Sequence, residues 1–353
     1  MWRVDGQLQR GAGAGTLPCS PPERGGGFVI ALEIIDAATV RARLPMRDCI
    51  EAMVTAMTGL TRGTIAVPSR IIMPLVDQSG YFAVMPGSAS EPLVYGAKVA
   101  GLHPANLAAG RPVIQGVVIL FDHRTGTPLA LVDGAEITAL RTAAASGLAT
   151  RLLAREDARS LGLLGYSVQA DTHLEAICAV RDIREVRVWG RSAERAQQFV
   201  NRHAGTCRAR LTVAATAAEA AACDVVCAVT AAREPVIRGE WVQPGAHVNL
   251  VGAHAPNARE ADTALIARSR VYVDSAAGAF SEAGDILIPI AEGAIGRSHV
   301  VGEIGALLLG SIAGRSGPKD ITVYKSLGSV AQDLVAAHLV YARGQSARCV
   351  PGQ

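Results

Sequence analysis

A short turn that contains glycine carries the clearest chemistry in this sequence. An apolar run at 161–164 leads into Gly-Tyr-Ser-Val-Gln-Ala at 165–170, and apolar side chains at helical spacing follow. A strand, a tight turn and a helix in this order open a dinucleotide-binding unit, in which the helix N-terminus holds the pyrophosphate. Gly165 can adopt the positive φ that such a turn needs, and Ala170 suits the position where helix and strand pack.

Ser167 stands where the usual pattern has its second glycine. Serine adds only a Cβ and a hydroxyl group, and that hydroxyl can donate to a phosphate oxygen. We interpret the turn as a nucleotide site with a tolerated substitution. The alternative is an αβ unit that binds no nucleotide.

The end of the next predicted strand, Gly190-Arg191-Ser192, bears on the choice of cofactor. An NAD site carries an acidic residue here, whereas an arginine can pair with the 2′-phosphate of NADP. This favours NADPH, with NADH as the alternative, unless Arg191 is only a solvated surface charge. The residues predicted to contact the cofactor are Gly165, Ser167, Val168, Gln169, Arg191, Ser192, Thr230 and Val251.

The remaining apolar runs predict the elements that position the turn. Runs at 224–230, 246–252 and 270–274 alternate with helical segments and predict further parallel strands. Together with the turn they predict an α/β Rossmann domain for NAD(P) at residues 151–315.

A second, α+β domain is predicted from residues 28–150 together with a C-terminal return at 316–345. It starts with helical patterning, continues as strands, and ends its first part in an alanine-rich helix at 136–154. The strands expected there are 64–74, 81–85, 113–121 and 128–132. A helix at 329–342 is expected to pack back on this domain. Residues 1–27, rich in glycine and proline, are predicted to be a flexible tail or an upstream translation artefact.

The composition of the 353 residues limits the possible functions. Half of the residues are apolar, 18% are charged and the formal net charge is +3, so the chain lacks the basic excess typical of nucleic-acid partners. No apolar run reaches the ~18 residues of a membrane span. The seven cysteines form no CxxC pair and no metal-ligand spacing, which predicts no metal site and favours the cytoplasm.

Several motifs follow one another over residues 30–345. They are Gly126-Thr127-Pro128-Leu129-Ala130, Asp133-Gly134, Thr138, Arg141-Thr142-Ala143-Ala144-Ala145-Ser146, Gln169-Ala170, His173, Lys325-Ser326, Gly328 and Gln332-Asp333. In this order they resemble the ornithine cyclodeaminase/mu-crystallin family. The resemblance implies a homodimer whose α+β domain binds substrate and forms the subunit interface. It also implies a Rossmann domain that binds NAD(P), an active site between the domains, and a small α-amino acid or its cyclic imine as substrate.

The resemblance further implies three cations around the substrate carboxylate, Arg70, Lys98 and Arg141, with Gly328 lining the substrate. Arginine offers bidentate pairing to a carboxylate and lysine a point charge, so this set suits a small anion. The alternative is that each is a surface or structural charge. Lys98 lies in an apolar run, where burial of its ammonium group requires a partner.

Two positions separate the branches of this family. The cyclodeaminase pattern carries a glutamate and an aspartate, and this chain has Met85 and His254 in their places. Without these carboxylates the distal amine of ornithine lacks a partner, so cyclodeamination is not favoured. Val84-Met85-Pro86 resembles the ketimine-reductase branch instead.

We therefore predict NAD(P)H-dependent reduction of Δ1-pyrroline-2-carboxylate or Δ1-piperideine-2-carboxylate to L-proline or L-pipecolate. Lys98 and His254 are the predicted catalytic residues. Histidine can exchange a proton near neutral pH, so His254 would supply or relay one, unless it only forms a hydrogen bond within its own loop. The alternatives are an ornithine cyclodeaminase, an alanine-dehydrogenase-like oxidoreductase and a crystallin-like protein that binds NADPH without turnover.

Overall fold

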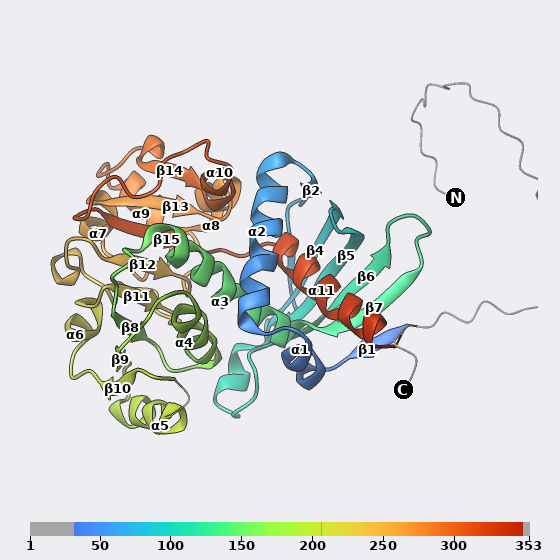
Figure 1. Ribbon diagram of the computed structural model, residues 1–353, viewed down its shortest axis with the longest axis horizontal. Coiled ribbons are helices and arrows are strands. Elements are labelled where there is room, and N and C mark those ends of the chain that lie inside the picture. The colour runs from blue at the N-terminus through green and yellow to red at the C-terminus, as the bar shows by residue number, and fades with distance from the viewer. Residues whose placement is uncertain (1–31, 206, 349–353) are drawn as a thin grey trace, which may run out of the picture. The chain divides into compact units, whose positions relative to one another are not determined.

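Two β-sheets organise the residues that the computed structural model describes, which are 32–205 and 207–348. Figure 1 shows the helices α2 (Met46–Arg62) and α3 (Gly134–Leu153) between these sheets. The tail predicted at 1–27 lies outside the described residues. Within the described part of the chain, no helix is both long enough and apolar enough to cross a membrane.

The first sheet has seven strands and is antiparallel except where β1 pairs with β7. Its strands are β1 Glu33–Ile35, β2 Ile65–Ala66, β3 Ile71–Pro74, β4 Tyr81–Ser90, β5 Leu93–Leu102, β6 Ile114–Asp122 and β7 Pro128–Asp133. Burial alternates along β4 and β5, as expected for a sheet that is covered on one face.

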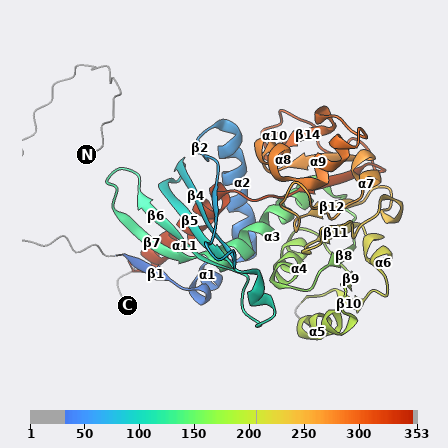
Figure 2. The same ribbon diagram turned by 180° about the vertical axis from the view of Figure 1, so that it is seen from behind.

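Three helices accompany this sheet: α1 (Ala37–Arg43), α2 (Met46–Arg62) and α11 (Val330–Arg348). Helix α11 contacts β4, β5 and β6, and α2 packs on α11. Figure 2 shows α11 running across the sheet. This confirms that the helix expected at 329–342 packs against the first sheet.

The second sheet has eight strands, all of them parallel. In the order in which they lie they are β10 Arg210–Val213, β9 Glu185–Trp189, β8 Ser160–Leu164, β11 Val225–Ala228, β12 His247–Leu250, β15 Ile321–Lys325, β13 Ser269–Val273 and β14 Val300–Glu303. The accompanying helices are α4 Val168–Val180, α5 Ala193–His203, α6 Ala217–Ala221, α7 Thr263–Ala267, α8 Ala276–Glu282, α9 Gly284–Ala291 and α10 Ile304–Leu308. Parallel strands alternating with helices confirm the predicted α/β class.

Strand β15 corrects the predicted path of the chain. Ile321–Lys325 pairs with β12 on one side and with β13 on the other, so it lies inside the Rossmann sheet. The chain therefore leaves this sheet after Lys325, and not at residue 316. Apolar patterning identifies a buried strand but does not give its place in the sheet, because parallel strands are joined by crossovers. The division into domains itself stays a prediction.

The stretch 64–74, predicted as one strand, forms two short strands, β2 and β3. Pro68 lies between them, and proline cannot donate to the ladder of a sheet. The chain leaves the sheet at this point, and the resulting gap contains Arg70.

Helix α3 (Gly134–Leu153) connects the two sheets. It begins after Asp133, whose side chain accepts a hydrogen bond from the backbone N–H of Glu136 at 2.7 Å. Small residues let it pack closely, since a Cβ added at Gly147 would lie 3.3 Å from Ala176 on α4. The helix contacts β6 of the first sheet and β12 of the second, and so fixes the sheets relative to one another.

Candidate active site

A buried carboxylate on α11 joins two of the predicted cations. Lys98 Nζ lies 2.9 Å from Asp333 Oδ2, and Arg141 Nε lies 2.9 Å from Asp333 Oδ1. Arg141 Nη1 also donates to Gln332 Oε1 at 2.8 Å. Lys98 and Arg141 are 7% and 5% exposed, and Asp333 is fully buried. Charges at this depth need partners, and one carboxylate between two cations leaves an excess of positive charge.

Burial changes the proton affinity of this cluster. It lowers the pKa of Lys98 to about 8, with Asp333 opposing the shift and Arg141 adding to it. Burial raises the pKa of Asp333, but Lys98 and Arg141 outweigh this effect and hold that pKa below its ordinary value. Asp333 is therefore ionised, and Lys98 can release its proton near neutral pH.

Gly328 brings the third predicted cation to the same cluster. Arg70 donates from Nη2 to the carbonyl oxygen of Gly328 at 3.1 Å, and this nitrogen lies 3.3 Å from Glu282 Oε2 on α8. Gly328 has a φ of +75°, and an added Cβ would overlap the guanidinium group of Arg141. Arg70, Lys98 and Arg141 thus lie in one cluster. Their carboxylate partners are Asp333 and Glu282.

Asp274, directly after β13, holds the turn at Gly328. Its Oδ2 accepts hydrogen bonds from the backbone N–H groups of Leu327 at 2.9 Å and Gly328 at 2.6 Å. Burial raises the pKa of Asp274, and these two donors oppose the shift. The Rossmann sheet thereby positions a residue that contacts Arg70 and Arg141.

The turn at 165–170, which we call the phosphate turn after its predicted role, is held in place by its glycine. Gly165 has a φ of +123° and donates its N–H to the Trp189 carbonyl oxygen at 2.8 Å. An added Cβ would lie 2.9 Å from the carbonyl oxygen of Val229. Ser167 is the N-cap residue of α4, yet its exposed side chain makes no capping bond. Its hydroxyl and the first N–H groups of the helix therefore fit a phosphate.

The next residues of α4 connect this turn to α3. Val168 is 58% exposed, and Gln169 Oε1 is buried without a hydrogen-bond partner among the described residues. His173 is fully buried, and its Nδ1 bonds the Gln169 carbonyl oxygen at 2.6 Å while its Nε2 bonds Ser146 Oγ at 3.0 Å. Burial lowers the pKa of His173 to about 4, so the ring is neutral. Because Nδ1 faces a carbonyl oxygen, which can only accept, Nδ1 carries the proton. This motif histidine ties the phosphate turn to the helix that carries Arg141.

The residues after β9 take separate roles. Arg191 is exposed, and Ser192 caps α5 by accepting a hydrogen bond from the backbone N–H of Arg195 at 3.2 Å. A Cβ added at Gly190 would overlap the ring of Tyr166, so the exit of β9 touches the phosphate turn. Arg191 is thus an exposed arginine directly after a residue that touches this turn.

Thr230 and Val251 follow the neighbouring strands β11 and β12, at the strand ends where ligands of such sheets bind. His254 lies three residues after Val251 and is exposed. Its Nδ1 bonds the carbonyl oxygen of Gly252 at 3.1 Å, which is the local hydrogen bond of the alternative interpretation. Its catalytic role stays a prediction.

Comparison with known proteins identifies the family of this chain. A sequence model of the ornithine cyclodeaminase/mu-crystallin family matches residues 32–348. The chain belongs to this family. It is 35% identical over 320 residues to the ketimine reductase mu-crystallin of Mus musculus, covering 90% of this chain and 97% of that protein.

Two solved structures have the same fold as this chain. Thermococcus litoralis Δ1-pyrroline-2-carboxylate reductase, in complex with NADH and L-proline, superposes with a TM-score of 0.87 at 34% identity, covering 90% of this chain and 98% of that one. An archaeal alanine dehydrogenase dimer with bound NAD gives a TM-score of 0.84 at 30% identity, covering 90% and 97%.

The β4–β5 hairpin shows how this chain departs from the cyclodeaminase pattern of the family. Met85 lies directly opposite Lys98 and is 9% exposed. Residues that face each other across antiparallel strands lie on the same side of the sheet. A glutamate at position 85 would therefore lie beside the Lys98 ammonium group, where this chain offers a thioether.

Sequence reasoning gave no role to several acidic residues of this site. Asp333 had a signal, because it is an acidic side chain between the apolar pairs Val330-Ala331 and Leu334-Val335 of a predicted helix, and a buried carboxylate requires a partner. Asp274 and Glu282 had none, since each follows or ends an ordinary strand or helix. Their partners are distant in sequence, so only the fold brings them to Arg70 and Gly328.

Proposed function

We propose that this protein uses NAD(P)H to reduce a cyclic imino acid, Δ1-pyrroline-2-carboxylate or Δ1-piperideine-2-carboxylate, to L-proline or L-pipecolate. The observation that carries the proposal is the cluster of Lys98, Asp333 and Arg141 with Met85 opposite the lysine. The two cations can bind a substrate carboxylate. Met85 offers only a thioether at the position where the distal amine of a diamino acid would need a carboxylate. The ketimine reductase and the Δ1-pyrroline-2-carboxylate reductase among the relatives support the same reaction.

In this proposal Arg70, Lys98 and Arg141 hold the substrate carboxylate. Reduction adds a hydride to the carbon of the C=N bond and a proton to its nitrogen, and bound NAD(P)H supplies the hydride. Because the pKa of Lys98 is about 8, its ammonium group can donate the proton near neutral pH and regain one from solvent. His254, exposed on the loop after β12, is the second candidate for the proton donor.

The cofactor is proposed to lie across the carboxyl ends of the parallel strands. The open N-terminus of α4 suits the pyrophosphate, because unpaired N–H groups and the helix dipole favour negative charge there. The exposed Arg191 supports NADPH over NADH, since it can pair with a 2′-phosphate. The residues proposed to hold the cofactor are Gly165, Ser167, Val168, Gln169, Arg191, Ser192, Thr230 and Val251.

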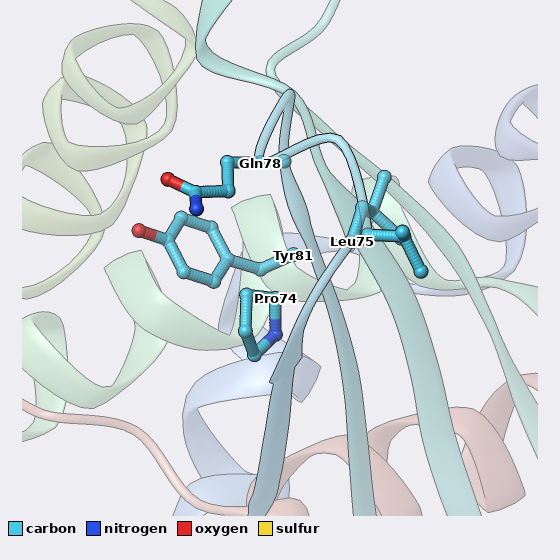
Figure 3. Close-up of a pocket in the computed structure, with 6 residues that line it drawn as sticks. Pro74, Leu75, Gln78 and Tyr81 are labelled. Atoms are coloured by element: carbon cyan, nitrogen blue, oxygen red, sulfur yellow. The ribbon is translucent and has the colours of Figure 1, made fainter.

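The exposed strand β3 is proposed as part of a homodimer interface. Ile71, Ile72 and Met73 are 60%, 55% and 52% exposed. Residues 74–81 contribute to an open hollow of about 570 Å³ beside them, where Pro74, Gln78 and Tyr81 lie on one side of the turn (Figure 3). Apolar patches of this kind mark interaction surfaces, and most oligomers pair identical chains. Light scattering tests the proposal, which predicts a dimer that Ile72→Asp converts to a monomer.

Two further assignments follow from the same proposal. The first sheet with helix α11 would be the substrate-binding and dimerisation domain, and the second sheet with its helices the NAD(P)-binding domain. The five cysteines that the structure describes as free thiols support a cytoplasmic location.

A substrate panel tests the proposed reaction. The purified protein is assayed with the two cyclic imines, with L-ornithine, and with pyruvate plus ammonia, each with NADPH, NADH or the oxidised cofactor. We expect oxidation of NADPH that depends on the cyclic imine. Release of ammonia from ornithine, or oxidation of NADPH only with pyruvate and ammonia, would overturn the proposal.

A further inference from the structure

The structure assigns to Glu260 a positioning role: its carboxylate fixes the two loops that carry Thr230 and Val251 in the arrangement that receives the nicotinamide end of the cofactor. The inference rests on the proposed function for the identity of the cofactor. The contacts that carry it do not depend on that identity.

The strand order shows which end of a dinucleotide meets these loops. The phosphate turn follows β8, and Arg191 follows β9 on one side of it. Strands β11 and β12 lie on the other side of β8. A dinucleotide that crosses the strand ends with its 2′-phosphate at Arg191 therefore brings its opposite end to the loops after β11 and β12.

Glu260 is fully buried and accepts four hydrogen bonds from these two loops. Its Oε1 accepts from the backbone N–H of Thr230 at 2.8 Å and from the Thr230 hydroxyl at 2.7 Å. Its Oε2 accepts from the backbone N–H groups of Val251 at 3.2 Å and Gly252 at 2.6 Å. One carboxylate thus joins the two loops, with one oxygen on each.

The two loops also touch each other at Gly252. A Cβ added there would collide with the carbonyl oxygen of Thr230 and would lie 2.6 Å from Glu260 Oε1. No room remains at this point for a larger residue. A displacement of the carboxylate must therefore move both loops together.

The buried ion pair of Asp285 with Lys325 holds the backbone at Glu260. Asp285 Oδ1 accepts hydrogen bonds from the backbone N–H groups of Glu260 at 2.8 Å and Ala261 at 3.0 Å. Lys325 Nζ lies 3.0 Å from Asp285 Oδ2 and donates to the carbonyl oxygen of Ala253. Asp285 and Lys325 are fully buried. The lysine of the Lys-Ser motif therefore supports the loop after β12 as well.

These contacts suit an ionised carboxylate and not an amide. All four groups that face Glu260 from the two loops are donors, and a carboxylate only accepts. Burial raises the pKa of Glu260, and the nearby Lys325 opposes that shift. A glutamine would turn its NH2 group toward one loop, where its hydrogens would face N–H or O–H hydrogens.

The test compares Glu260→Gln with Glu240→Gln, the same change at a side chain that is 70% exposed. Glu260→Asp is the second variant, since it keeps the charge but shortens the reach to the loops. NADPH affinity is measured by fluorescence titration, and amide hydrogen exchange is measured without cofactor. In both Glu260 variants we expect the Kd for NADPH to rise about ten-fold, as for the loss of one charged hydrogen bond. We also expect faster hydrogen exchange at the amides of residues 230, 251 and 252, and unchanged exchange at the amides of β8.

Two outcomes would overturn the proposal. One is wild-type NADPH affinity together with wild-type exchange at these amides in whichever Glu260 variant folds. The other is faster exchange that extends to β8, because this would indicate a general loss of stability. A protein that reduces no cyclic imine but loses NADPH affinity in the Glu260 variants would contradict the proposed function and support the role of Glu260.

Discussion

Met85 and Lys98 face each other across the β4–β5 hairpin, so a thioether lies beside a buried ammonium group. A thioether carries no charge and is only a weak acceptor, so it forms no ion pair with that ammonium group or with a second amine. Lys98 instead has Asp333 as its ionic partner, and it shares that partner with Arg141. This pairing supports a substrate with one carboxylate and a C=N bond over a diamino acid.

Met85→Glu should therefore impair the proposed reduction. The new carboxylate would lie beside Lys98, raise its pKa above about 8 and repel the substrate carboxylate. We expect kcat/KM for the cyclic imine to fall by about ten-fold or more, which corresponds to roughly 1.4 kcal/mol. The pH profile of kcat should show its basic limb at higher pH. Met85→Leu serves as the control, and an unchanged profile in Met85→Glu would contradict the placement of Lys98 in proton transfer.

Arg141→Ala should remove binding of the substrate carboxylate without affecting the cofactor. The change deletes a buried guanidinium group and leaves Asp333 with one cation. We expect kcat/KM for the imine to fall by about a hundred-fold, of the order found for binding when one partner of a buried charge pair is truncated. The Kd for NADPH should stay near the wild-type value. Arg151→Ala is the control, because Arg151 is on the same helix and its side chain is 35% exposed. Intact imine reduction in Arg141→Ala would show that the carboxylate is held elsewhere.

Arg191→Ala should reduce the preference for NADPH. Arg191 is exposed and follows Gly190, which touches the phosphate turn, and only NADPH has a 2′-phosphate with which a guanidinium group can pair. We expect the KM for NADPH to rise about ten-fold, with the KM for NADH unchanged. Arg195→Ala, at an exposed position on α5, is the matched control. Equal use of both cofactors by the wild-type protein, with no effect of Arg191→Ala, would remove the argument for the 2′-phosphate.

His173 should make the protein less stable in mild acid. Burial lowers its pKa from 6.5 to about 4, so the unfolded chain takes up a proton between these values and the folded protein does not. The stability that this pKa difference contributes is fully present above pH 6.5 and is lost as the pH falls toward 4. The loss in the free energy of unfolding is about 3 kcal/mol.

Urea unfolding of the wild type and of His173→Asn between pH 7 and 4 measures this contribution. Asparagine keeps a donor for the Gln169 carbonyl but does not titrate. We expect the free energy of unfolding to fall less steeply with decreasing pH in the variant. Parallel curves would show that His173 is protonated in the folded protein or has an ordinary pKa there.

Local signals in the sequence were sufficient for the turn at 165–170 and for the strand and helix on either side of it. The run 161–164, the turn at Gly165 and the helix after it were all predictable, because their periodicity and turn chemistry depend only on neighbouring residues. Arg141 and Lys98 were identified through motif resemblance. Their convergence depends on Asp333, which is distant in sequence from both.

The role of Glu260 could be found only in the folded structure. Glu260 lies in a stretch with no strand or helix pattern of its own, and its partners follow two different strands. Nothing in its neighbourhood distinguishes it from a surface glutamate. Pairing across distant strands is set by crossovers and packing, which periodicity does not encode.

The place of β15 affects the order in which the protein can assemble during synthesis. Ile321–Lys325 separates β12 from β13, so each of these two strands lacks one of its two partners until almost the whole chain has left the ribosome. Until then both present open edges, which favour misassociation. The strands of the first sheet are complete by residue 133, but α11, which packs on β4, β5 and β6, is made after β15. Both sheets are therefore expected to depend on chaperones until the C-terminal segment is available. A chain that ends before residue 321 would lack the strand that joins β12 to β13, and β13 and β14 would have no place in the sheet.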